Sequence, residues 1–135
     1  MMKIIVHISG GTKMGLDIIR MAPAGDFRAG SYSGFMSWRE TLAELVDINL
    51  GCMKGFTIGG IPWTGEEPFY QLLSHSDCDG SLSAYECEEL VRDFETWDQQ
   101  AERDYGKDSY FKKLYDTWWE FCCDVVTDGG TLEFA

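Results

Sequence analysis

Two long segments with helical periodicity place the strongest constraint on how this chain can fold. Apolar side chains recur every three or four residues through 84–103, and Tyr105-Gly106 then interrupts the pattern. A second segment, 108–127, has a wider apolar stripe, which is typical of a helix that packs in the centre of a core. The sequence therefore predicts two long helices, the second of them central to the fold.

The first third of the chain predicts a small sheet. Residues 4–8 and 16–21 are rich in β-branched side chains and are expected to be strands, joined by a hairpin at 10–13. Segment 22–35 is rich in Gly, Pro and Ser and is expected to be a loop. In the gene, the codons for Gly10–Met14 could contain a ribosome-binding sequence followed directly by a start codon at Met14. Met14 is then the natural start, and residues 1–13 are an N-terminal extension.

The remaining segments predict further helices and one more strand. Ser37 and Glu40 form a capping-box pattern, so a helix is expected to begin there and to end at Gly51. The other expected elements are an ordered loop with one short strand at 51–65, a short helix at 66–74 and an edge strand at 129–134. Together these elements predict a mainly helical α+β fold in one domain, residues 1–135, with a small N-terminal sheet that the C-terminal strand could join.

Length and cysteine usage narrow the class of protein. The chain has 135 residues, and none of its apolar runs approaches the roughly 20 residues that a membrane-spanning helix needs. Its five cysteines are odd in number and contain no CxxC pair, which argues against a zinc ribbon or a disulfide redox site. We therefore expect a cytoplasmic protein with free and mostly buried thiols.

The net charge of −12 is concentrated in one part of the chain. Residues 66–104 contain twelve acidic and two basic side chains. Such a field repels nucleic-acid phosphates and anionic lipid, so direct binding to nucleic acid or membrane is not expected. It favours cations, basic protein partners, or a protein surface that normally binds nucleic acid. Solubility alone is the simpler explanation for the acidic balance.

Residues 75–86, HSDCDGSLSAYE, resemble the calcium-binding loop of an EF-hand. Such a loop takes ligands from positions 1, 3, 5, 7, 9 and 12 and needs glycine at position 6. Gly80 fits position 6, and helices are expected on both sides, so 66–103 predicts an EF-hand-like helix–loop–helix. The candidate metal ligands are His75, Asp77, Asp79, the Ser81 carbonyl, Ser83 and Glu86.

Two alternatives remain for this loop. Calcium prefers oxygen ligands, so His75 at position 1 predicts a weak calcium site, and Mn²⁺ or Zn²⁺ are the second choices. Without a metal, Ser83 and Glu86 would form a capping box for the following helix, and Asp77 and Asp79 would bond loop amides.

A wider resemblance rests on GSYSGF at 30–35 followed by Trp38-Arg39, on HSDCDG at 75–80, and on LEF at 132–134. This set is similar to a family of uncharacterised small proteins of bacteria and their phages. The resemblance implies a shared fold, the cytoplasm of a bacterial host cell and the importance of the first two stretches, but no activity. Tyr32 and Ser33 could offer hydroxyl groups to a ligand in a recognition loop, or the same loop could be a tight turn that fills the core.

The sequence contains no catalytic motif and only two histidines that could act as bases, so we do not expect an enzyme. The alternative is a metalloenzyme that uses the 75–86 loop. The expected function is that of a small acidic binding or regulatory protein with a degenerate EF-hand-like, cation-binding loop. A phage or mobile-element inhibitor that docks on a basic, nucleic-acid-binding surface is the second hypothesis. Its predicted contact residues are Glu88, Glu89, Asp93, Glu95, Asp98 and Glu102, although a solvated helix face would show the same charges.

Overall fold

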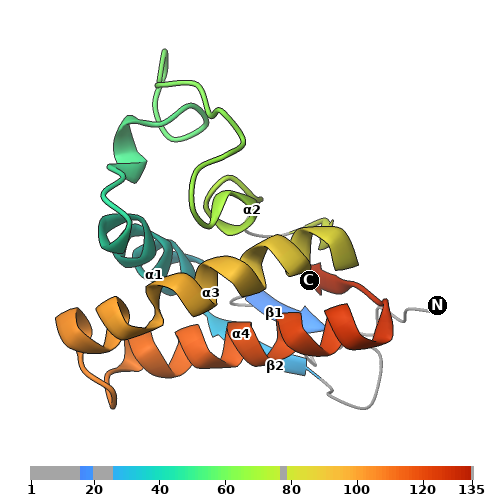
Figure 1. Ribbon diagram of the computed structural model, residues 1–135. Coiled ribbons are helices and arrows are strands. Elements are labelled where there is room, and N and C mark those ends of the chain that lie inside the picture. Colours follow the sequence, from blue (N-terminus) through green and yellow to red (C-terminus); the bar gives the residue numbers. More distant parts are fainter. Residues whose placement is uncertain (1–15, 20–25, 77–78, 135) are drawn as a thin grey trace.

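Two long antiparallel helices form one layer of the molecule (Figure 1). The computed structural model describes residues 16–19, 26–76 and 79–134. α3 spans Ala84–Tyr105 and α4 spans Tyr110–Asp128, so both helices predicted from the sequence are confirmed within a few residues. The positive φ of 77° at Gly129 lets this residue end α4, since glycine adopts that conformation without steric cost.

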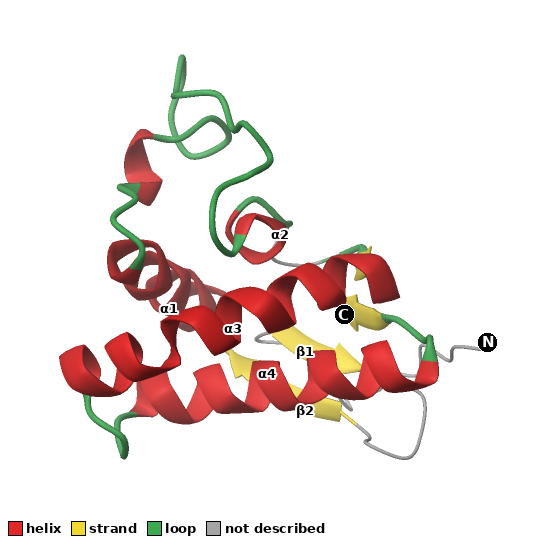
Figure 2. Ribbon diagram, in the orientation of Figure 1, coloured by secondary structure: helices red, strands yellow, loops and turns green. Residues whose placement is uncertain are grey.

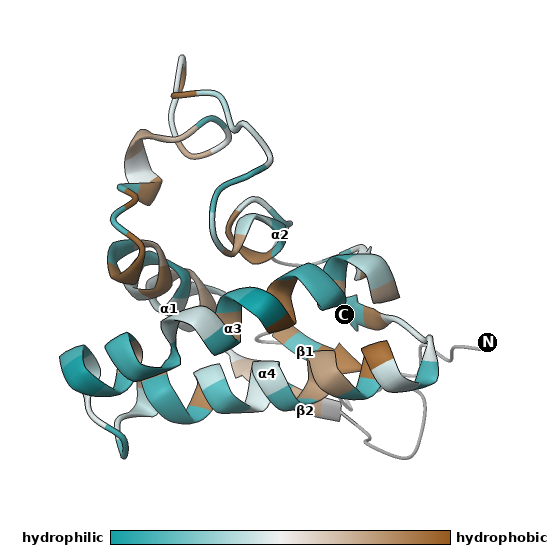
Figure 3. Ribbon diagram, in the orientation of Figure 1, coloured by the Kyte–Doolittle hydropathy of each residue, from teal (hydrophilic) through white to brown (hydrophobic). Residues whose placement is uncertain are grey.

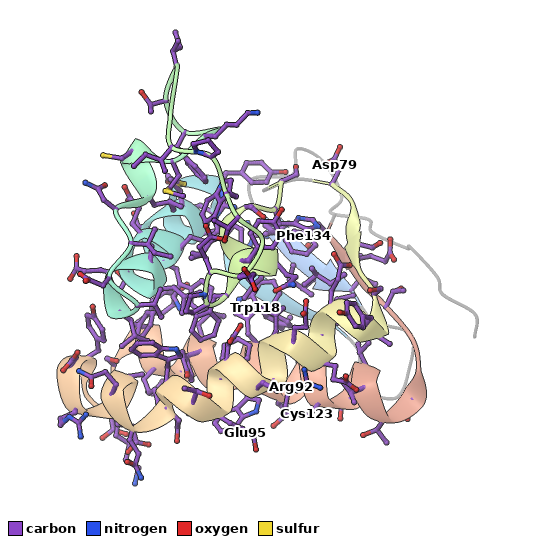
Figure 4. The ribbon with its side chains drawn as sticks, turned by 45° about the horizontal axis from the view of Figure 1, so that its top comes forward. Asp79, Arg92, Glu95, Trp118, Cys123 and Phe134 are labelled. Atoms are coloured by element: carbon purple, nitrogen blue, oxygen red, sulfur yellow. The ribbon has the colours of Figure 1, made fainter. Side chains whose placement is uncertain are left out.

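α4 lies at the centre of the core, as its wide apolar stripe predicts. Trp118 of α4 is fully buried, and its ring lies within 6.0 Å, between centroids, of rings from α1, β2 and β4. Figure 4 shows Trp118 near the middle of the molecule with Phe134 close to it. A second aromatic group, made by Phe69, Phe94 and Tyr115, joins the segment before α2 to α3 and α4.

A four-stranded antiparallel sheet forms the second layer (Figure 2). Its strands are β1 (Leu16–Ile19), β2 (Asp26–Gly30), β3 (Ser81–Leu82) and β4 (Leu132–Phe134), in the order β2-β1-β4-β3. The predicted C-terminal strand exists, but it was wrongly expected at an edge, because β3 pairs with its outer side. The mainly helical α+β class is confirmed.

β2 lies inside segment 22–35, so the prediction of a continuous loop there was wrong. The strand alternates as a half-buried strand does, with Phe27 packed on the core, Arg28 exposed and Ala29 buried. Arg28 stands opposite Asp17 of β1, with 3.6 Å between its Nη1 and the carboxylate. The glycine-rich flanks concealed this short alternation. The expected strand at 4–8, the hairpin at 10–13 and the start at Met14 lie outside the described residues.

α1 spans Tyr32–Leu45 and starts earlier than expected. Ser31, not Ser37, is its N-cap: the Ser31 Oγ accepts a hydrogen bond of 2.9 Å from the Gly34 N–H. The helix also ends before Gly51, at the C-cap Val46, and a short 3-10 helix, η1 (Leu50–Cys52), follows it. The SYSGF stretch is therefore the first turn of a helix rather than a loop.

α2 spans only Tyr70–Leu73, shorter than the expected helix at 66–74. Between η1 and α2 the chain runs outward from the body as a loop without an extended strand (Figure 2). Only isolated bridges, such as that between Met53 and Ile61, replace the short strand expected at 51–65.

Cys87 and Cys122 are buried free thiols, as predicted, whereas Cys52 is exposed. Burial raises the pKa of the Cys122 thiol, and hydrogen bonding to Cys87 acts in the same direction. In the described part of the chain, no helix combines the length and the apolar character that crossing a membrane requires.

Candidate functional site

The EF-hand-like loop is held closed by contacts among its own residues and β4. Both ring nitrogens of His75 face backbone carbonyl oxygens: Nδ1 lies 2.8 Å from that of Ser76, and Nε2 lies 3.1 Å from that of Ser81. The His75 ring also stacks on Phe134, with 3.9 Å between centroids. The Phe134 N–H donates to the Gly80 carbonyl at 2.9 Å. Two of the predicted ligands, the His75 ring and the Ser81 carbonyl, therefore lie within hydrogen-bond distance of each other.

Glu86, the candidate ligand at position 12, acts in a capping box. Its Oε1 accepts a 2.9 Å hydrogen bond from the Ser83 N–H, and the Ser83 Oγ accepts one of 3.2 Å from the Glu86 N–H. Asp79 is exposed, and Figure 4 shows it pointing away from the body. Asp77 and Cys78 lie outside the described residues.

Among the residues that the structure describes, no three His, Cys, Asp or Glu side chains form a group that could hold a metal ion. Cation binding would require His75 to leave at least one carbonyl and Glu86 to turn from Ser83. The cation site therefore stays a prediction, and the metal-free capping box is what the geometry displays.

The two candidate recognition hydroxyls sit at the start of α1. Tyr32 is half-buried and packs against the core, whereas Ser33 is exposed, with its Oγ 3.3 Å from that of Ser31. Helix capping and core packing thus account for this motif.

Part of the predicted acidic contact set surrounds one lysine. Lys112 of α4 is only 3% exposed, and its Nζ lies 2.8 Å from Asp98, 3.6 Å from Glu102 and 2.6 Å from Asp116. Burial acts to lower the pKa of Lys112, but hydrogen bonds to Asp116 and Asp98 outweigh it, so that pKa lies above its usual value. Asp98 and Glu102 are therefore partly neutralised within the fold.

Other members of the set connect α3 to the segment around α2. The Phe69 N–H donates to Asp93 at 2.9 Å, and the Gln71 amide donates to Glu89. Burial raises the pKa of Asp93, while the bond from Phe69 opposes this effect. A contact that anchors α2 cannot be given up to a partner without cost.

The last two residues of the predicted acidic contact set lie on the outer face of α3. Glu88 pairs with Arg92 at 3.1 Å, and Glu95 is exposed (Figure 4). Figure 3 shows that this face of α3 is largely hydrophilic, as a solvated helix face is. The structure thus distributes the six predicted contact residues over three different environments.

A different acidic site, which the sequence did not single out, lies at the C-terminal end of α1. Glu40, Glu44 and Asp47 line a groove of about 460 Å³ whose other walls are made by residues 48–51. All three side chains are exposed, and none forms an ion pair with the described residues. The phenol of Tyr105 donates to Glu44 at 3.3 Å.

The C-terminal end of a helix is an unfavourable place for these carboxylates. The C-terminal end of a helix dipole is negative, and like charges four residues apart, such as Glu40 and Glu44, repel each other. Asp47 in addition adopts a positive φ of 65°. Sequence reasoning missed the groove because it assigned Glu40 to a capping box and looked for acidic contact residues only within 66–104.

Comparisons of the chain with family models, with curated proteins and with solved structures gave no match. The resemblance to small bacterial and phage proteins therefore stays a prediction, and function has to be argued from the geometry.

Proposed function

We propose that this protein is a small, non-catalytic binding protein that docks on a basic surface of a protein partner. The groove at the end of α1 is the site. The observation that carries the proposal is its three exposed carboxylates, which form no ion pair within residues 16–19, 26–76 and 79–134. This keeps the expected class of an acidic binding or inhibitory protein but moves the contact site from α3 to α1.

The groove suits a lysine or arginine side chain. Ile48 and Leu50 supply apolar wall for an aliphatic stem, and the carboxylates lie around the charged head. A cation there would relieve the repulsion between Glu40 and Glu44 and would complement the negative end of the helix dipole. A nucleic-acid-binding surface is rich in such side chains, and so it fits the second hypothesis drawn from the sequence.

The test begins with a photo-crosslinking amino acid at Asn49, an exposed residue of the groove. Cells that carry the gene would be irradiated, and the captured protein would be purified and titrated against variants. We expect Glu40→Gln, Glu44→Gln and Asp47→Asn together to weaken binding by about tenfold or more, as three ion pairs of about 0.5 kcal/mol each imply. The wild-type affinity should fall as NaCl increases.

A matched control separates the groove from overall charge. Glu95→Gln, Asp104→Asn and Glu120→Gln remove the same three charges from exposed positions elsewhere, and we expect them to change the affinity less than about threefold. Equal effects of the two triple variants would contradict the groove as the site.

A further inference from the structure

We propose that residues 53–63, the projecting segment, form a docking element whose tip, Ile58, inserts into an apolar pocket of the partner. This inference rests on the proposed function, because it assumes a protein partner, and it specifies that partner further. The partner surface would carry an apolar pocket beside the basic residues that face the groove.

The first observation is the exposure of large apolar side chains on this segment. Ile58 is 103% exposed and Ile61 is 57% exposed, whereas most large aliphatic side chains of the described residues are buried. Figure 1 shows the segment extending away from the helices and the sheet, and Figure 3 shows apolar residues along it. Leaving an isoleucine fully in water forfeits the favourable free energy of its burial.

The second observation is that the segment is fixed at its base. Met53 is buried, Phe56 and Trp63 pack against the core, and the Trp63 ring lies 5.7 Å from that of Tyr70. The Trp63 indole N–H donates to the Lys54 carbonyl at 3.0 Å, which ties the two arms of the segment together. An anchored loop loses less conformational entropy on binding than a mobile one does.

The third observation is the turn at the tip. The Gly60 N–H approaches the Thr57 carbonyl at 3.3 Å, and Gly59 has a φ of 70°, which places Ile58 at the outer corner of a four-residue turn. A Cβ added at Gly60 would meet the backbone of Met53 at 2.5 Å, so the second arm packs closely on the first. The backbone geometry therefore directs Ile58 outward.

Charge identifies the occupant as a different protein rather than a second copy of this chain. Residues 51–65 contain a single charged side chain, Lys54, within a molecule of net charge −12. Two copies would bring their acidic grooves close together, because the base of the segment adjoins the groove: the Ile61 N–H donates at 2.9 Å to the carbonyl of Cys52, the residue after groove-lining Gly51. A partner with an apolar pocket rimmed by Lys or Arg complements both the tip and the groove.

The experiment uses the 135-residue chain with a photo-crosslinking residue at position 57 in place of Thr57. A second variant carries it at Lys113 of α4, the control position. Both residues are exposed. The protein captured in cells that carry the gene would be purified, and its affinity measured for the wild type, for Ile58→Ser and for Val126→Ser. Val126 is an exposed aliphatic residue of α4 and provides a matched substitution away from the surface.

We expect an adduct at position 57 but not at position 113. The affinity of Ile58→Ser should be 10- to 100-fold weaker, because the complex loses the burial of about one isoleucine side chain. Val126→Ser should bind as the wild type does. All variants should keep the wild-type melting temperature within about 2 °C, because these side chains make few packing contacts.

The outcomes distinguish this inference from the proposed function. If Ile58→Ser binds with wild-type affinity while the groove variant loses affinity, only the inference that Ile58 docks on the partner is overturned. If the groove variant binds with wild-type affinity and Ile58→Ser binds more weakly, the proposal that the partner surface is basic is overturned instead. Absence of an adduct at position 57, or a wild-type dimer that Ile58→Ser converts to a monomer in sedimentation, would also overturn the inference.

Discussion

Lys112 carries a charge that the fold has almost removed from water, and three carboxylates compensate for it. We predict that Lys112→Met lowers the free energy of unfolding by about 2 kcal/mol, less than a fully buried pair would lose because Asp98, Glu102 and Asp116 stay partly hydrated. Urea unfolding measures this change. Lys113→Met, one residue away but exposed, is the control and should change the value by less than about 0.5 kcal/mol.

The same lysine predicts how stability depends on alkaline pH. Hydrogen bonds to Asp116 and Asp98, acting against burial, raise the pKa of Lys112 above its ordinary value of 10.5. Its contribution is therefore complete below pH 10.5 and is lost as the pH rises through the folded-state pKa. Melting temperatures measured from pH 8 upward should thus converge for the wild type and Lys112→Met. A difference that grows with pH would contradict this assignment.

His75 and Glu86 predict weak calcium binding, because each must give up an existing bond to reach a metal. We expect a Kd for Ca²⁺ of about 1 mM or weaker by calorimetry, near the weak end of EF-hand sites. Asp79→Ala should abolish the heat signal. Micromolar affinity would show that the closed loop rearranges readily.

At the scale of elements, the first prediction concerns which of two serines caps the start of α1. Ser31→Ala should lower the free energy of unfolding by about 1 kcal/mol, because Ser31 caps the Gly34 N–H. Ser37→Ala should be neutral or slightly stabilising, since Ser37 is exposed inside the helix and alanine is the better helix former. Thermal unfolding of both variants tests the boundary. A larger loss from Ser37→Ala would restore the start expected from sequence.

Long periodic segments were predictable, and short paired ones were not. α3 and α4 follow from apolar spacing because each repeats its pattern over several turns. β2 is only five residues long and exists by pairing with β1, so no local signal fixes it. The inner position of β4 likewise depends on β3, two residues that the EF-hand reading assigned to a metal loop.

At the scale of the whole molecule, contacts between distant segments decide which acidic and apolar side chains stay available to a partner. Charge counting showed that acidic side chains dominate 66–104, but not that Lys112 would partly neutralise two of them, Asp98 and Glu102. Nor does any pattern in 51–65 reveal that Ile58 stays exposed while Phe56 packs inward. Both features arise only when the chain is folded, and together they locate the surface that we assign to a partner.

The central claim is that one surface, made by the groove and the projecting segment, meets that partner. The most direct test is a comparison of ¹H–¹⁵N NMR spectra of the labelled protein with and without the captured partner. We predict that the largest shifts and line broadening fall within residues 40–51 and 57–61, while the outer face of α3 and the sheet change little. Perturbations concentrated on Glu88, Glu95 and their neighbours, with 57–61 unaffected, would contradict the account.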